Sequence, residues 1–241
     1  RGRVWRLYDK LRPGMFSWMQ VSLLCLLTKE KVRTGKKYED WLKPYLVSNT
    51  LELLDKEIPR FKDKIESVQL CFTTDPFMYG YPEVERMAID SIKKLNAAGI
   101  KCTTLTKGIL PQELAQCSSD NEYGITLISL DEDYREMMEP GAAPYAERLA
   151  ALKGLHDQGC KTWVSVEPYP TPNLIQQDLM ELLESIGFVD KIIFGRTNYN
   201  KKISEYKEHK KFYNECAKTV MRFCDERGLA CHIKEKTITE E

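Results

Sequence analysis

The hydrophobic positions of the chain follow two alternating spacings, which predict strands and helices in turn. Short apolar runs rich in β-formers, typical of buried strands, occupy residues 68–73, 100–105, 124–129, 161–166, 190–194 and 229–233. Between these runs, apolar residues recur every three to four positions, as on the buried face of a helix. Start signals and spacing predict helices from Asn49, Pro82, Pro144 and Asn173, about residues 111–116, and over 206–223.

Strands that alternate with helices in this way require parallel pairing with right-handed crossovers. No glycine-rich dinucleotide-binding sequence marks a doubly wound sheet, so the pattern favours an α/β fold of the partial or full (β/α) barrel type. The regular pattern covers residues 49–241, which we assign to the barrel. Residues 1–48 have no clear periodicity and are assigned to an atypical N-terminal segment.

Composition and charge exclude some classes of function. Lysine plus arginine equals aspartate plus glutamate at 36 each, so the net charge gives no argument for nucleic acid or membrane binding. The most apolar N-terminal stretch, residues 15–27, is too short for a membrane span and is interrupted by polar residues. The eight cysteines contain no C-x-x-C pair and are interpreted as buried thiols of a reducing compartment. We therefore expect a cytoplasmic protein without a membrane partner.

Polar residues follow the predicted strands at the points where these end. In a parallel barrel the carboxyl ends of the strands meet at one face, which would bring together Asp75, Lys107, Ser129, Asp131, Glu167, Arg196 and Asn198. This set predicts a ligand site at that face. One interpretation is a cofactor-independent hydrolase in which Asp131 and Glu167 form an acid/base pair.

Four segments at these strand ends carry a more specific signal. They are Thr74-Asp75-Pro76-Phe77 with Glu83 and Glu85 downstream, Leu105-Thr106-Lys107-Gly108, Ser129-Leu130-Asp131-Glu132, and Glu139-Pro140-Gly141-Ala142-Ala143-Pro144 with Arg148-Leu149. In this order they resemble the radical S-adenosylmethionine (SAM) proteins related to spore photoproduct lyase. The resemblance covers residues 70–150 by motif, and the later strands extend it by architecture.

The resemblance implies a partial (β/α)6 TIM-type barrel with parallel strands inside and helices outside. It also implies a lyase-like radical SAM enzyme, in which a [4Fe-4S] cluster passes one electron to SAM. The products would be methionine and a 5'-deoxyadenosyl radical, which abstracts hydrogen from a substrate. The substrate of this chain is unknown; nucleic acid, whose lesions the named relatives repair, is one candidate, and an electron donor would be a further partner.

The resemblance assigns SAM-binding roles to six residues at strand ends: Thr73, Thr74, Asp75, Lys107, Ser129 and Glu167. The first three correspond to the loop that contacts the methionine end of SAM, and Lys107 to a lysine that pairs with the SAM carboxylate. Ser129 and Glu167 lie where the fourth and fifth strands meet the cofactor. A zwitterionic ligand needs both a cationic partner and hydrogen-bond acceptors, so these residue types suit it.

One defining motif of the family is absent from this sequence. The C-x3-C-x2-C run, whose thiolates hold three irons of the cluster, belongs between the first strand and the first helix. Residues 1–48 contain only Cys25, which is either the remnant of the last cluster ligand or a core thiol. The segment is then an altered cluster loop, the chain is a fragment, or the protein is a degenerate, cluster-free barrel. In the last case it would be a binding module for SAM or another small ligand, or an interaction module.

Overall fold

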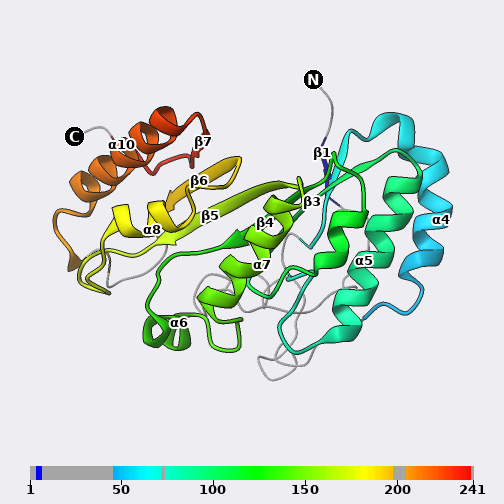
Figure 1. Ribbon diagram of the computed structural model, residues 1–241, viewed down its shortest axis with the longest axis horizontal. Coiled ribbons are helices and arrows are strands. Elements are labelled where there is room, and N and C mark those ends of the chain that lie inside the picture. The colour runs from blue at the N-terminus through cyan, green and yellow to red at the C-terminus, as the bar shows by residue number, and fades with distance from the viewer. Residues whose placement is uncertain (1–3, 7–45, 72–73, 198–202, 204, 240–241) are drawn as a thin grey trace.

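The computed structural model describes residues 4–6, 46–71, 74–197, 203 and 205–239. In this part of the chain, seven strands form one sheet whose spatial order is the chain order (Figure 1). They are β1 (Val4–Arg6), β2 (Ser67–Gln69), β3 (Lys101–Thr106), β4 (Glu122–Thr126), β5 (Lys161–Tyr169), β6 (Lys191–Arg196) and β7 (Ala230–Ile233). Every neighbouring pair is parallel, which confirms the predicted fold class.

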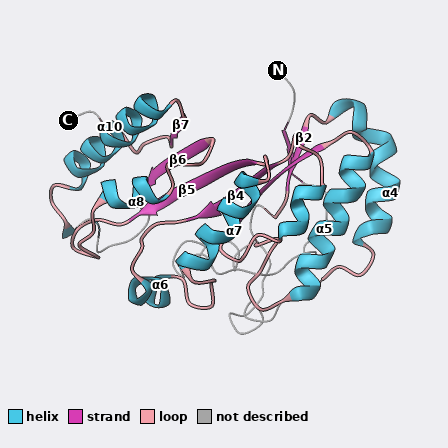
Figure 2. Ribbon diagram, viewed as in Figure 1, coloured by secondary structure: helices cyan, strands magenta, loops and turns pink. Residues whose placement is uncertain are grey.

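Helices connect the strands and cover the sheet (Figure 2). They are α4 (Thr50–Phe61), α5 (Pro82–Ala97), α6 (Glu132–Met138), α7 (Tyr145–Asp157), α8 (Leu179–Ser185) and α10 (His209–Arg227), with short 3-10 turns at Lys62–Lys64 and Gln112–Gln116. Helix α5 packs on β3, α7 on β4 and β5, and α10 on β6 and β7. Because each connection leads to the next strand in the same direction, right-handed crossovers place these helices on one face of a curled sheet. The result is a partial TIM-type barrel.

Helix α5 shows how the sequence pattern builds this layer. It begins with Pro82 in its first turn, and Gly99 follows it with a φ of +76°, a left-handed conformation that glycine adopts at low cost. Val84, Ala88 and Ile92 lie on one face of the helix and are buried, as their spacing predicts.

The ends of two strands differ from the predictions. Strand β2 ends at Gln69 rather than residue 73, because Cys71 turns into the left-handed region with a φ of +53°. Strand β5 continues through Glu167 and Pro168 to Tyr169, with a shift of register against β6 where proline has no amide to donate. The prediction that Glu167 ends this strand is therefore wrong.

The helical segments beyond β4 and β5 also differ from the predictions. Asp178, not Asn173, caps α8: its carboxylate accepts a bond of 2.7 Å from the Met180 amide, whereas the Asn173 side chain bonds to Thr171 in a turn. Helix α6 was not predicted at all; its seven residues carry too few apolar positions for a periodic signal. None of the described helices is long and apolar enough to cross a membrane.

Candidate functional site

The loop after β2 is fixed to the end of β3 by the carboxylate of Asp75. Its Oδ1 accepts hydrogen bonds from the Phe77 amide, at 2.9 Å, and from the Thr106 hydroxyl, while its Oδ2 accepts one from the Lys107 amide at 2.7 Å. Two strand ends that the sequence predicts to converge are thus in direct contact. Asp75 acts here as a brace inside the protein, because both of its oxygens are engaged.

Gly108 allows this close approach. A Cβ atom added at this position would lie 1.7 Å from the Phe77 carbonyl oxygen, a distance that no side chain can occupy. The glycine of the Thr106-Lys107-Gly108 segment is therefore required where the backbones of the two loops meet.

Lys107 leads from this contact into a buried ion cluster. Its ammonium pairs with Oε1 of Glu139, and Oε2 of Glu139 accepts a bond of 2.9 Å from Nη1 of Arg148. The exposed fractions of the three side chains are 10% for Lys107, 1% for Glu139 and 0% for Arg148. We call these residues the Lys107–Glu139–Arg148 cluster.

Arg148, on α7, ties several elements together. Its Nε donates to the Ala143 carbonyl at 2.8 Å, and its Nη1 also donates to the Thr126 carbonyl, at the end of β4, at 2.9 Å. The Ala143 amide donates to the Lys107 carbonyl at 2.9 Å, so the segment before α7 is bound to β3. Among the described residues, the remaining nitrogen, Nη2, has no hydrogen-bond partner although it is buried.

Charge and burial act in opposite directions on the two carboxylates. Burial by itself raises the pKa of Glu139, but the charges of Lys107 and Arg148 and their hydrogen bonds hold it below its ordinary value. Burial raises the pKa of Asp75, and the hydrogen bonds from Thr106, Lys107 and Phe77 only partly oppose this rise. Glu139 is thus the stable anion of the site.

The other predicted residues in the segments after β2 and β4 have local partners. The Thr74 amide donates to the Cys71 carbonyl at 3.4 Å, and burial raises the pKa of the Cys71 thiol to about 12. Ser129 is fully buried, and its hydroxyl accepts a bond of 3.1 Å from the Asp131 amide. Asp131 caps α6 by accepting a bond of 2.7 Å from the Tyr134 amide. Its carboxylate therefore has a structural partner.

Glu167, near the end of β5, contacts β6 and the residue that follows β7. Its carboxylate covers the bare Cα of Gly195 on β6, where an added Cβ would come within 2.8 Å, and it pairs with Lys234 at 3.4 Å. Since Asp131 caps α6 and Glu167 pairs with Lys234, the described structure does not join them as the acid/base pair of a hydrolase.

The structure thus groups some predicted site residues and leaves others apart. It joins Asp75 to Lys107, whereas Ser129 and Glu167 have other partners; Thr73 and Cys25 lie outside the described residues. The six residues predicted to bind SAM include neither Glu139 nor Arg148. Both residues nevertheless belong to the fourth of the segments that carry the family resemblance.

Comparison with known proteins assigns a family to this fold and site. The profile of the radical SAM superfamily matches residues 27–186, about two thirds of the chain. The chain belongs to the radical SAM superfamily.

Solved structures of radical SAM proteins share the fold. Spore photoproduct lyase complexed with dinucleoside spore photoproduct aligns over 93% of this chain and 78% of its own, with a TM-score of 0.65 and 13% identity. SuiB of Streptococcus suis bound to S-adenosylmethionine aligns over 79% of this chain and 43% of its own, with a TM-score of 0.58 and 16% identity. At such identities the likeness concerns the fold alone.

A curated relative shares more of the sequence. The uncharacterized protein ORF301 of Acidianus two-tailed virus is 25% identical over 150 residues, which are 61% of this chain and 49% of that protein. The chain therefore spans about half the length of the curated relative that it matches.

The metal centre of the superfamily does not fit the donors in the described structure. A [4Fe-4S] cluster that activates SAM takes three thiolates, whereas residues 1–48 supply Cys25 alone. Within the described ranges, no group of three or more His, Cys, Asp or Glu side chains could hold a metal ion.

Proposed function

We propose that this chain binds SAM at the carboxyl ends of β2 to β5 and serves the lyase-type radical chemistry of its superfamily on an unidentified substrate. The observation that supports the proposal is Lys107, an ammonium held in place at the end of a central strand. A carboxylate ligand gains most from a cation that is already fixed and largely shielded from water. Lys107 would therefore bind the carboxylate of SAM.

The remaining roles follow from the position of each residue. Asp75 fixes the described part of the loop after β2, which includes Thr74, so it orients this loop rather than contacting the ligand. Thr73 and Thr74 are assigned to the methionine end of SAM. Ser129 is buried in the segment that follows the carboxyl end of β4, and it is assigned to the same ligand. Glu167 is partly exposed and is assigned to the nucleoside end of SAM.

The proposal has two forms, a radical enzyme that holds a [4Fe-4S] cluster and a barrel without one. When bound, a [4Fe-4S] cluster would supply the electron that cleaves SAM. The missing C-x3-C-x2-C run favours the second form, a cluster-free barrel that binds SAM or another small ligand, or acts as an interaction module.

Anaerobic reconstitution with iron and sulfide separates these two forms. About four irons per chain, with SAM cleaved on reduction, would support the radical enzyme and imply ligands beyond Cys25. SAM binding without iron would support the cluster-free barrel. A chain that binds neither iron nor SAM would contradict the proposal.

Lys107→Ala tests the SAM site itself. Loss of a charge-assisted hydrogen bond of roughly 1.5–3 kcal/mol should weaken SAM binding on the order of tenfold or more in calorimetric titration. Lys101→Ala, at the opposite end of the same strand, removes an exposed lysine 3.9 Å from Glu66 and should leave the affinity unchanged. An unchanged dissociation constant for Lys107→Ala would count against the assignment.

Partners and compartment complete the proposal. The seven cysteines among the described residues are free thiols, which supports a reducing compartment such as the cytoplasm. Nucleic acid is the first substrate class to test, because the similar spore photoproduct lyase was solved with a dinucleoside and because Lys207, Lys210 and Lys211 are exposed near the start of α10. The radical form would also require an electron donor.

A further inference from the structure

Lys107 is held by contacts to both its backbone and its side chain. Its backbone amide donates to Asp75, its carbonyl accepts from the Ala143 amide, and its ammonium pairs with Glu139. A lysine side chain is flexible and strongly hydrated, so at the surface it would sample many positions. Here Glu139 selects one of them.

Arg148 in turn holds Glu139 in place. It donates to the second carboxylate oxygen at 2.9 Å, while bonds to the Ala143 and Thr126 carbonyls fix the guanidinium itself. Asp75 is the other carboxylate near the cluster, but its oxygens accept from Thr106 and from two backbone amides. Among the described side chains, Glu139 is therefore the anion that contacts the ammonium.

This arrangement leaves the ammonium able to bind a ligand. Lysine has three N–H donors, and Glu139 accepts one of them. A purely structural pair is a poor explanation of the cluster, because replacing buried ion pairs by apolar residues is often neutral or stabilising. The bonds of Arg148 to Ala143 and Thr126 already attach the segment before α7 to the sheet.

We propose that Glu139 is a positioning residue for the ligand-binding ammonium of Lys107, with Arg148 as the anchor of Glu139. Glu139 then keeps the ammonium in one position at the end of β3. The inference rests on the proposed function, since it takes SAM as the ligand whose carboxylate meets Lys107.

The test uses Glu139→Asp, which keeps the negative charge but withdraws it by one methylene. Calorimetric titration of the full chain with SAM and with decarboxylated SAM compares a ligand that has the carboxylate with one that lacks it. We expect SAM to bind about tenfold more weakly, which corresponds to about 1.4 kcal/mol. Decarboxylated SAM should bind the variant and the parent chain equally well.

Two further variants separate positioning from damage to the fold. Glu132→Asp shortens a carboxylate of the neighbouring segment that bonds to Arg135 and to the Tyr145 amide, and it should not change SAM affinity. Combining Glu139→Asp with Lys107→Ala should weaken SAM binding no more than Lys107→Ala alone, because Glu139 acts through Lys107.

Each other outcome overturns the inference. Normal SAM binding by Glu139→Asp would leave the proposed function intact and remove the positioning role. Equal losses for both ligands, or additive losses in the double variant, would mean that Glu139 supports the fold instead. Failure of the parent chain to bind SAM would refute the proposed function itself.

Discussion

The two ends of the central strands are both polar and buried, but they are built from different chemical groups. At the carboxyl ends, the Lys107–Glu139–Arg148 cluster and Asp75 bury ionisable side chains. At the amino ends of β3 and β4, the side-chain amides of Asn121 and Asn96 form two hydrogen bonds with each other, of 2.8 and 3.0 Å. The Asn121 side-chain oxygen also accepts a hydrogen bond of 2.7 Å from the Cys102 backbone amide. This second group, which we call the Asn96–Asn121 network, has no charged member.

The two groups differ in what their burial costs. Neutral amides satisfy buried backbone groups at a modest desolvation cost, whereas buried charges lose several kcal/mol of hydration each, on the order of what their pairing returns. Charges concentrated at the carboxyl ends therefore support the proposal that this face binds the ligand, as in other barrels of this type.

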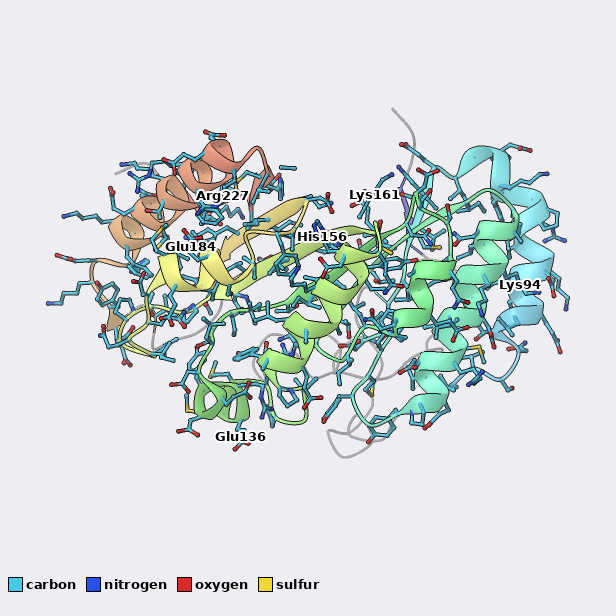
Figure 3. All side chains as sticks on the ribbon, viewed as in Figure 1. Lys94, Glu136, His156, Lys161, Glu184 and Arg227 are labelled. Carbon is cyan, nitrogen blue, oxygen red and sulfur yellow. The ribbon has the colours of Figure 1, made fainter. Side chains whose placement is uncertain are left out.

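The largest test of this comparison is Arg148→Met. Removing the guanidinium leaves Glu139 with one cation in a buried site, and we expect the free energy of unfolding to fall by about 3–5 kcal/mol in urea denaturation. Arg227→Met is the matched control: Arg227 also pairs with a glutamate, Glu184, at 2.6 Å, but on the exposed surface (Figure 3). Its loss should cost at most about 1 kcal/mol. Equal losses in the two variants would show that burial does not set the strength of these pairs.

A medium effect is expected from Asn121→Ala at the amino ends. The change leaves the Cys102 amide and the Asn96 side chain without a shared partner in the core, at a cost of roughly 2–3 kcal/mol of unfolding free energy. Because this network lies at the opposite ends of the strands, SAM affinity should not change in the folded variant.

The control for Asn121→Ala is Asn214→Ala on α10. The Asn214 side chain also makes two hydrogen bonds, but to the backbone carbonyl and amide of Thr239, which lies after β7. Its removal should therefore have a smaller effect on global unfolding. A loss of SAM binding in Asn121→Ala would contradict the separation between the two ends.

The alternation of strands and helices could be predicted because it depends on the local spacing of apolar residues. Helix α5 begins at Pro82 and ends just before Gly99, as expected. The parallel order of the strands follows from the repeated strand–helix unit. Helix α6 and the continuation of β5 past Glu167 escaped prediction. The first depends on one capping aspartate rather than on periodicity, and the second on pairing with β6, which overrides the local signal of Pro168.

For the site, the sequence predicted that the ends of β2 and β3 converge, but not which side chains pair. Asp75 and Lys107 were expected at one face and are in contact. The burial of Arg148 runs against the usual exposure of arginine, and its pairing with Glu139 depends on how the segment before α7 folds over β3. Such contacts between separate elements have no periodic signature in a single sequence.

The smallest effect sharpens the comparison by pH. Because Lys107 and Arg148 hold the pKa of Glu139 below its ordinary value of about 4.3, the unfolded chain takes up this proton first as the pH falls. The stabilisation by Glu139 is therefore complete above the ordinary pKa and is lost as the pH falls through the lowered one. The raised pKa of Asp75 acts in the opposite sense, so wild type must be compared with Glu139→Gln rather than judged alone. The difference in unfolding free energy between these two proteins, measured in urea from pH 7 down to about pH 3, should shrink with acid.

Glu184→Gln, on the exposed pair, controls for the loss of any carboxylate and should show little difference at either pH. If the difference for Glu139→Gln stayed constant, Glu139 would not be an anion stabilised by its two cations, and the carboxyl ends would be as neutral as the amino ends.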